Sequence, residues 1–282
     1  MHWMFFALVD VVGMAIANVI RRVIMKDDES DAYASVIAFQ FFGFLMILVF
    51  TLIHGFVMPP ITTYPFNFLV QAVLWGLSSY YLFRAFQYLE ASKITILTTF
   101  SSVVTIISAI FFLHDVFNHI RLIGVILILF SVILVTYNPK KMRLNKGVFY
   151  AIASSVCMGL AIVNDVFLFK RSDLFSLLVV GWLTPALFLV LIRPQAISKM
   201  KYFLKWNNLK KMLLLTFFYV VGGTSYYFAI TIGGQTSQVS PISQATIIVT
   251  IIFAAIFLKE RDHLAKKIFS AILVTIGVLL LS

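Results

Sequence analysis

The sequence predicts an all-α membrane protein with ten transmembrane helices, arranged as two inverted five-helix repeats. Three observations lead to this fold class. Hydrophobic residues make up 61% of the 282-residue chain and charged residues only 12%, whereas a soluble domain carries about 25% charged residues. Apolar runs of about 20 residues follow one another along the chain, and a run of this length crosses a bilayer as a helix. Finally, segments of the first half return in the second half.

The apolar runs define the expected helices, and polar or Pro- and Gly-containing segments separate them. Irregular backbone cannot face lipid, so these separating segments belong at the membrane surfaces or in a cavity. The first run starts at His2 without a basic segment or a small-residue cleavage site, so we interpret it as a retained helix and not as a signal peptide. The expected spans are approximately 2–24, 32–55, 68–89, 93–113, 118–137, 147–169, 173–192, 210–232, 237–258 and 264–281.

An internal repeat organises these helices. The tripeptide Ser-Tyr-Tyr at 79–81 returns at 225–227, and the apolar run that follows it returns at a nearly constant offset. The two copies meet near Asn138–Lys146, which predicts repeat units at 1–139 and 140–282. Each unit holds an odd number of helices, so the second unit enters the membrane from the opposite side. Inverted repeats are frequent in secondary transporters, which bind substrate between the copies near the bilayer midplane.

The distribution of positive charge predicts the orientation. Of the 22 Lys and Arg residues, 19 are nearest the loops that join helices 1–2, 3–4, 5–6, 7–8 and 9–10. The positive-inside rule therefore places these loops in the cytoplasm and both termini outside. The same clustering explains the net charge of +11 without nucleic acid, because basic residues in short loops orient helices and meet lipid headgroups.

Several chemistries find no support in the sequence. The single cysteine, Cys157, excludes an intrachain disulfide and a Cys-rich metal site. The five histidines lie at expected helix ends or in loops, and neither a metalloprotease motif nor a phosphate-binding glycine loop is present. We therefore expect no enzyme activity, no metal and no cofactor.

Charged residues inside the expected helices are candidate functional residues by default. Asp10 either binds a proton or cation in a central cavity or is an interfacial carboxylate held by a neighbouring helix. Arg84 either meets an anionic group or extends to the nearby interface. Asp165 lies close to Lys170-Arg171, and a local ion pair is the preferred interpretation, yet it shares a face with Ser154, and that face is the repeat counterpart of the Asp10 face.

Polar and aromatic residues at repeat-matched positions indicate a cavity wall. An aromatic wall with one carboxylate suits an organic cation or an amino acid. Gly222-Gly223 indicates either close helix packing or cavity lining. The candidate substrate-binding residues are Asp10, Trp75, Ser79, Tyr80, Tyr81, Arg84, Thr98, Tyr226, Tyr227 and Gln244. Asp10 and Asp165 are the candidate coupling-ion or proton sites, and no metal site is predicted.

The order of these motifs resembles the drug/metabolite transporter superfamily and, within it, the EamA-type ten-helix permeases. The resemblance rests on 79–115, on the run from Gln238-Val239-Ser240-Pro241 to Phe257-Leu258-Lys259-Glu260, and on the closing helix that contains Gly277. In the first copy the matching acid is Asp115, and Ile96 replaces the proline. Many relatives keep both termini in the cytoplasm, whereas the charge count places them outside here, and we follow the charges.

The resemblance implies an alternating-access carrier with a cavity lined by helices 1, 3, 4, 6, 8 and 9, but it does not identify the substrate. We expect a secondary transporter of a small polar or amphipathic metabolite, an amino acid or organic cation. The expected setting is a prokaryotic plasma membrane, with the chain as a monomer or homodimer. The alternative is a non-transporting membrane scaffold or a lipid- or partner-binding protein, which predicts no central polar cavity.

Overall fold

The computed structural model describes residues 2–113, 119–136, 145–232 and 236–281, and their regular structure is entirely helical. This confirms the all-α class. The helices are α1 His2–Met25, α2 Ala32–His54, α3 Pro65–Tyr88, α4 Ala91–Thr98, α5 Phe100–Leu113, α6 His119–Thr136, α7 Lys146–Phe169, α8 Leu174–Ile192, α9 Ala196–Lys199, the 3₁₀ helix η1 Met200–Leu204, α10 Trp206–Thr231, α11 Thr236–Phe257 and α12 Leu264–Leu281.

Eight helical stretches of the described chain are long and apolar enough to cross a membrane, with α4 and α5 together counting as one. They support an integral membrane protein, and the count of ten spans stays a prediction. The two long helices outside this set are α3 and α11. In α3, residues such as Gln71, Ser78 and Arg84 lower the mean hydropathy. In α11, Ile242–Phe257 is an apolar helical stretch.

Polar caps fix where several helices begin. Asp31 accepts hydrogen bonds from the backbone of Tyr33 and Ala34 at the start of α2, and Asp173 accepts one from Ser176 at the start of α8. Asn145 caps α7 in the same way. Such caps satisfy backbone N–H groups that have no partner within the helix.

The membrane span predicted at 93–113 corresponds to α4 and α5, which form one apolar stretch, Ala91–Phe112, with a break at Thr99. The Oγ1 atoms of Thr95, Thr98 and Thr99 donate to main-chain carbonyls three or four residues earlier. Hydroxyls bonded in this way bend helices. The predicted loop before helix 8 also contains more structure than expected, since α9 and η1 occupy its middle.

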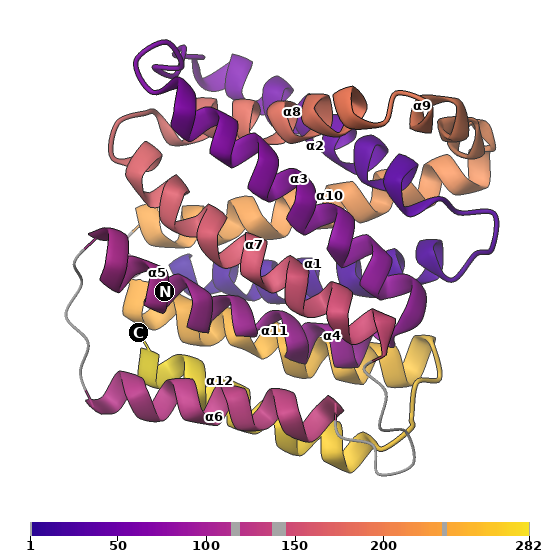
Figure 1. The fold of residues 1–282 in the computed structure, drawn as a ribbon, viewed down its shortest axis with the longest axis vertical. Coiled ribbons are helices and arrows are strands. Elements are labelled where there is room, and N and C mark those ends of the chain that lie inside the picture. Colours follow the sequence, from indigo (N-terminus) through magenta and orange to yellow (C-terminus); the bar gives the residue numbers. More distant parts are fainter. Residues whose placement is uncertain (1, 114–118, 137–144, 233–235, 282) are drawn as a thin grey trace.

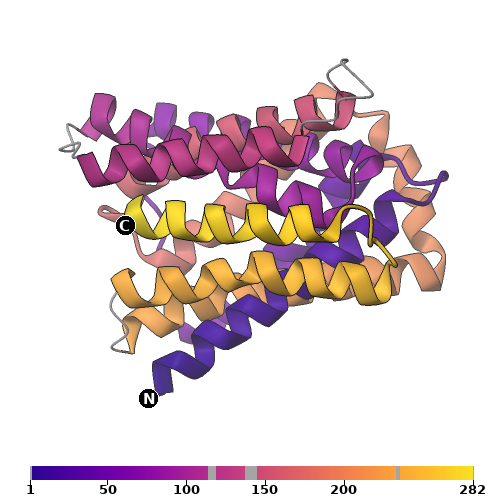
Figure 2. The same ribbon diagram turned by 90° about the horizontal axis from the view of Figure 1, so that it is seen from below.

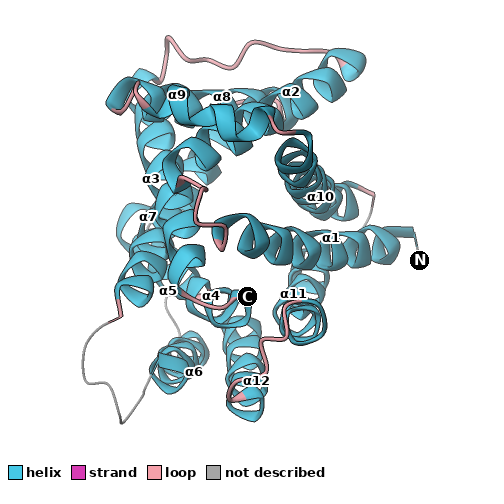
Figure 3. Cartoon of the chain, turned by 90° about the vertical axis from the view of Figure 1, so that its right-hand side faces the viewer, coloured by secondary structure: helices cyan, strands magenta, loops and turns pink. Residues whose placement is uncertain are grey.

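Figure 1 shows the long helices side by side in layers, with α2 and α8 at one edge and α6 and α12 at the other. Between these edges, α3 packs on α7 and α1 packs on α10 and α11. Seen from the helix ends, the pair α3 and α7 stands opposite the pair α1 and α10 (Figure 3).

The two ends of this helical body differ in charge. Both termini lie at the same end (Figures 1 and 2), which we call the cavity end. The opposite end carries the loops between α1 and α2 and between α11 and α12, together with α9 and η1. We call it the basic end, because most Lys and Arg residues are nearest its loops.

Candidate functional site

A cavity of about 200 Å³ lies between α1, α2, α3, α7, α8 and α10. It lies toward the cavity end: Gln71 follows the start of α3, Leu177 follows the start of α8, and Asp165 and Tyr227 precede the ends of α7 and α10. All four helix ends concerned are at that end of the protein. The cavity is small compared with pockets for drug-sized ligands, which occupy about 300–1,000 Å³.

The carboxylate of Asp165 is the charged group of this cavity. Gln71 Nε2 donates to Oδ1 at 2.9 Å and Trp75 Nε1 donates to Oδ2 at 2.7 Å. The side chain is 8% exposed, and the ion pairs found in the described part of the chain all involve other carboxylates. The expected local ion pair with Lys170-Arg171 is therefore replaced by hydrogen bonds to α3, while the Arg171 guanidinium lies over the Phe167 ring at 3.8 Å.

Neutral polar groups complete the wall. Gln40 Nε2 donates to Ser79 Oγ at 2.9 Å, which joins α2 to α3 beside the cavity. Gln71 Oε1 is buried and has no hydrogen-bond partner. The cavity therefore presents hydrogen-bond acceptors close to the carboxylate, together with Thr224 and Tyr227 of α10.

Aromatic rings close the cavity toward the basic end. The rings of Phe39, Trp182 and Tyr219 contact one another with centroid separations of 5.1–5.8 Å, and all three line the cavity. Gly43 makes room for this layer, because a Cβ atom there would lie 2.1 Å from the Trp182 ring. We call these three rings the aromatic floor.

Beneath the aromatic floor lies Arg21, which is 2% exposed. Its guanidinium lies 5.1–5.4 Å from four ring centroids. It also donates a hydrogen bond to the neutral side chain of Asn18, at 3.3 Å from Oδ1. The four rings belong to Phe39, Phe83, Phe86 and Tyr219. Cation–π attraction thus holds a buried charge where water is excluded.

The two adjacent glycines of α10 have different surroundings. A Cβ atom on Gly222 would lie 3.1–3.3 Å from Met14 and from the Asp10 carbonyl oxygen, so this glycine allows α1 and α10 to pack closely. A Cβ atom on Gly223 would meet nothing within 4 Å, and this residue lines the cavity. Both interpretations of Gly222-Gly223 therefore hold, one for each residue.

Asp10 lies on α1, one turn before Met14, which lines the cavity. It is 5% exposed, and Ser243 Oγ of α11 donates a hydrogen bond to its Oδ2. The residue is outside the cavity lining, although its backbone contacts Gly222. The structure thus places the two candidate coupling carboxylates in different surroundings, with only Asp165 at the cavity surface.

The remaining candidates divide into two groups. The residues that line the cavity with Asp165 are Trp75, Ser79 and Tyr227. The residues outside its lining, besides Asp10, are Tyr80, Tyr81, Arg84, Thr98, Tyr226 and Gln244. Thr98 closes α4, where its hydroxyl donates to the Thr95 carbonyl, and Tyr226 packs against Ala7 and Val239. In the run from Gln238 to Pro241, Val239 is buried, and the side chains of Gln238, Ser240 and Pro241 lie outside the described part of the chain.

Sequence reasoning left Gln40 and Trp182 out of the candidate site. Gln40 is the single amide in α2, an otherwise strongly apolar helix, and that contrast was the available signal. Trp182 gives no such signal, because aromatic residues are common throughout the chain. No cluster of three metal-ligating side chains occurs among the described residues.

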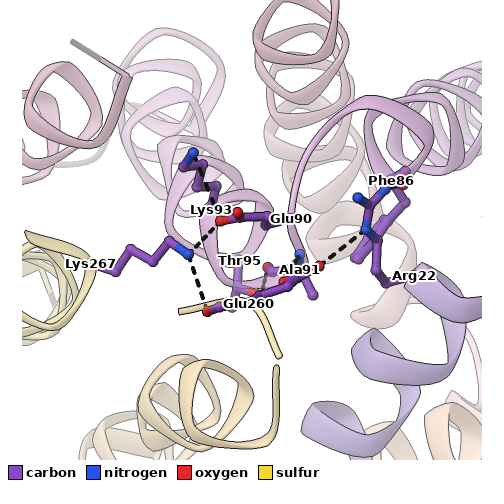
Figure 4. A network of polar contacts seen from close by, with 8 residues as sticks. All are labelled: Arg22, Phe86, Glu90, Ala91, Lys93, Thr95, Glu260 and Lys267. Atoms are coloured by element: carbon purple, nitrogen blue, oxygen red, sulfur yellow. Dashed lines mark hydrogen bonds and ion pairs between the residues drawn. The ribbon is translucent and has the colours of Figure 1, made fainter. Parts of the chain in front are cut away.

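At the basic end, ion pairs join segments that are far apart in the sequence (Figure 4). Arg22 Nε of α1 pairs with Glu260 Oε1 at 3.2 Å, and Glu260 Oε2 accepts the backbone N–H of Ala91 at 2.9 Å. Lys267 of α12 pairs with Glu90 and also lies 3.5 Å from the Glu260 carbonyl oxygen. We call Arg22, Glu90, Lys93, Glu260 and Lys267 the basic-end network.

The basic-end network is largely shielded from water. Lys267 is 1% exposed and the Glu260 side chain 9%. Burial raises the pKa of Glu260, and the neighbouring Arg22 guanidinium opposes this effect. The network ties α1, the α3–α4 link, the α11–α12 link and α12 together on the side where the aromatic floor closes the cavity.

Comparison with known proteins identifies the family. Two segments of the chain, residues 1–137 and 145–282, match the EamA-like transporter family. A solved structure described only as the crystal structure of a protein has a TM-score of 0.57 and 11% sequence identity, and the match covers 96% of this chain and 98% of the other. At this identity it supports the fold alone. Among curated proteins, none matches this chain.

The family match confirms the resemblance seen in the sequence, and it covers nearly the whole chain in two parts. The family is generally non-enzymatic, in agreement with a site that offers one carboxylate, amides and aromatic rings. The chain therefore belongs to the EamA-like transporter family and is an integral membrane transporter of the drug/metabolite type.

Proposed function

We propose that this chain is a secondary transporter of a small metabolite that carries a cationic amine, such as an amino acid or an organic cation. Asp165 receives the cationic group, and Trp75, Ser79 and Tyr227 line the same space. Asp10 and Asp165 are the proposed coupling-ion or proton sites.

The observation that carries this proposal is the Asp165 carboxylate, which is buried beside a cavity with neutral donors as its partners. A buried carboxylate without a cation is costly in a membrane protein, and such groups mark substrate and ion pathways. The unpartnered Gln71 Oε1 offers a further acceptor nearby. A ligand ammonium supplies the missing positive charge, and the rings of Trp75 and Trp182 favour it through cation–π attraction.

We propose ten transmembrane helices in two inverted units, 1–139 and 140–282. In support, the helix contacts between the two halves occur in matched pairs. The packing of α1 on α10 and α11 corresponds to that of α7 on α3 and α5, while α2 with α8 and α6 with α12 pair across the two halves. The opposite directions of α1 and α7 also agree with inversion (Figure 1).

Alternating access is the proposed mechanism, because the two ends of the protein differ. The cavity lies toward the cavity end, while the aromatic floor and the basic-end network lie toward the other end. For release at the basic end, the Arg22–Glu260 and Lys267–Glu90 pairs must separate and the aromatic floor must part. The charge distribution supports placing this end in the cytoplasm.

The rival interpretation, a non-transporting scaffold, gives no reason for a carboxylate at the surface of an internal cavity. The proposed partners are accordingly a small-molecule substrate and the lipid bilayer, with the protein as a monomer or homodimer in a prokaryotic plasma membrane.

The test is a thermal-unfolding screen of the purified protein against amino acids, amines, quaternary amines, sugars and nucleosides, followed by uptake into proteoliposomes. An amine-bearing compound is expected to raise the unfolding temperature and to be transported. Asp165→Asn should remove both effects, since the amide keeps the shape but lacks the charge. Sugars as the only stabilising ligands contradict the proposed substrate class.

Asp10→Asn is the matched control, because Asp10 is equally buried but lies outside the cavity lining. This variant should still bind the amine, while a changed pH dependence of uptake identifies it as a coupling site. If Asp165→Asn still binds the amine and Asp10→Asn does not, the amine binds at Asp10, and this result overturns the proposal.

A further inference from the structure

A group of tyrosines lies near the basic end, outside the cavity lining. The ring centroids of Tyr33 and Tyr80 are 5.1 Å apart, those of Tyr80 and Tyr81 5.5 Å, and those of Tyr81 and Tyr150 6.2 Å. Tyr88 stacks on Tyr150 at 5.9 Å. These five residues, which we call the tyrosine cluster, come from α2, α3 and α7 and form one continuous aromatic surface.

Two arginines border the tyrosine cluster. The Arg84 guanidinium lies 5.3 Å from the Tyr150 ring centroid and 5.5 Å from that of Tyr88, and Arg193 lies 5.6 Å from the Tyr33 ring. Both guanidinium groups interact electrostatically with Tyr80. The cluster therefore stands between two positive charges.

The charge of Arg84 is not balanced by a carboxylate. Its guanidinium donates hydrogen bonds to Gln87 Oε1 at 2.7 Å and to the Tyr88 hydroxyl at 3.3 Å and also interacts with the Tyr150 side chain, and its buried Nε has no partner. These partners are neutral, and the ion pairs of the described residues do not include Arg84. The guanidinium thus keeps donor capacity for an anion.

The acidic group that interacts with Arg193, Asp31, already has another cationic partner. Asp31 acts on Arg193 electrostatically, but its Oδ2 pairs with Lys199 at 2.6 Å. One carboxylate therefore faces two cations here, and Arg84 adds a third positive charge to the same end of the protein.

The surroundings of the tyrosine cluster belong to the membrane surface. Tyr88 ends α3, Arg193 follows α8, and Tyr150 lies near the start of α7. Adjacent apolar side chains point outward, with Phe149 60% exposed, Leu191 81% and Ile192 58%. Exposed apolar residues beside tyrosines and arginines at helix ends mark the level of lipid headgroups.

We propose that the tyrosine cluster, with Arg84 and Arg193, binds the phosphate headgroup of an anionic phospholipid. Guanidinium groups match phosphate oxygens in geometry and charge, and basic pockets between helices on the cytoplasmic side bind anionic headgroups. The acyl chains lie on the exposed faces of α7 and α8. Tyr80, Tyr81 and Arg84 then act in lipid binding and not in substrate binding. This inference does not depend on the identity of the transported compound.

The test measures thermal unfolding of the detergent-solubilised full-length protein with added phosphatidylglycerol, phosphatidylcholine of the same chains, or inorganic phosphate. Phosphatidylglycerol at about ten times its dissociation constant is expected to raise the unfolding temperature by about 3–5 °C, with little change from the other two additives. Equal effects of the two lipids overturn the proposal. An equal effect of inorganic phosphate overturns the assignment to lipid.

Three variants locate the site. Arg84→Gln should lose most of the phosphatidylglycerol effect, and Arg193→Gln, at an exposed position that carries no folding risk, should lose part of it. Arg171→Gln is the matched control, because Arg171 also lies over aromatic rings, those of Phe167 and Tyr64, but at the cavity end. A full phosphatidylglycerol effect in both Arg84→Gln and Arg193→Gln contradicts the proposed site, as does its loss in Arg171→Gln.

Discussion

The two ends of this transporter use charge in opposite ways. At the cavity end, Asp165 is held by neutral donors and its charge has no cationic partner among the described residues. At the basic end, Glu90 and Glu260 are paired with Lys267 and Arg22. The difference shows which charges are available to a ligand and which hold helices together.

The hydrogen bonds between helices follow the same division. At the cavity end, Asn67 and Asn164 bond reciprocally, with Asn67 Nδ2 donating to Asn164 Oδ1 at 2.8 Å and Asn164 Nδ2 to the Asn67 carbonyl at 3.0 Å. These bonds join α3 and α7, one helix of each half, through neutral groups. At the basic end, the network joins the two halves through ion pairs. Separating the halves at the basic end therefore breaks charged contacts, whereas separating Asn67 from Asn164 breaks neutral ones.

The largest expected effect comes from removing the buried cation of the basic-end network. Lys267→Met leaves Glu90 with the more exposed Lys93, 3.8 Å away, as its remaining cation. Breaking a buried pair on one side costs about 3 kcal/mol, which chemical unfolding should detect. The double variant Glu90→Gln/Lys267→Met should recover part of this loss, because no unpaired charge remains. A double variant as unstable as the single one contradicts a specific pairing.

The next effect separates packing from cavity lining on α10. Gly222→Ala forces a methyl group against Met14 and the Asp10 carbonyl and should cost about 2 kcal/mol through overpacking. Gly223→Ala faces open space and should gain about 0.5–1 kcal/mol from helix propensity, while weakening ligand binding because the methyl group enters the cavity. Unfolding and ligand titration measure both effects. Equal stability losses in the two variants contradict the different surroundings.

A third prediction concerns the population of the closed basic end. Glu260→Gln removes the charge that holds Arg22 but keeps an oxygen for the Ala91 N–H. If the substitution removes about 1.4 kcal/mol of stabilisation from the state with a closed basic end, the population with an open basic end rises about tenfold. In a Cys157→Ser background, a Ser92→Cys probe, at a position that is 0% exposed near the start of α4, should react about tenfold faster with a maleimide.

The matched probe for this measurement is Leu178→Cys in the cavity lining. If opening at the basic end accompanies closure at the cavity end, labelling of Leu178→Cys falls as labelling of Ser92→Cys rises. Faster labelling at both positions indicates local unfolding and contradicts alternating access.

The helical class and most helix positions could be predicted from the sequence, because hydrophobic length and polar caps are local properties. The break at Thr99 could not be predicted, because it depends on threonine hydroxyl groups that donate hydrogen bonds to main-chain carbonyls of the preceding turn. A continuous apolar pattern runs across this break, and the pattern carries no information about such bends.

For the candidate site, sequence patterns identified polar and aromatic residues but not their directions. Repeat symmetry placed Tyr80-Tyr81 and Tyr226-Tyr227 on equivalent positions, yet only Tyr227 lines the cavity. The cavity lies toward one end of the protein, so residues at equivalent repeat positions have different surroundings. The partners of Asp165 lie on a helix about 90 residues away, and such long-range pairing is absent from local spacing.

The smallest predicted effect concerns a surface contact at the basic end. The Tyr202 hydroxyl donates to Asp27 Oδ2 at 2.7 Å, and this bond lowers the pKa of Asp27 below its ordinary value of 3.8. A lowered pKa stabilises the folded protein above the ordinary value, and this stabilisation disappears as the pH falls through the folded-state pKa. Tyr202→Phe should therefore cost about 1 kcal/mol or less at neutral pH, and less at a pH below 3.8. Tyr33→Phe is the control, because the Tyr33 hydroxyl donates to the Leu189 carbonyl, which does not titrate. The loss of stability in Tyr33→Phe should be the same at both pH values. If the loss in Tyr202→Phe is also independent of pH, Asp27 is not among the contacts that stabilise the basic end.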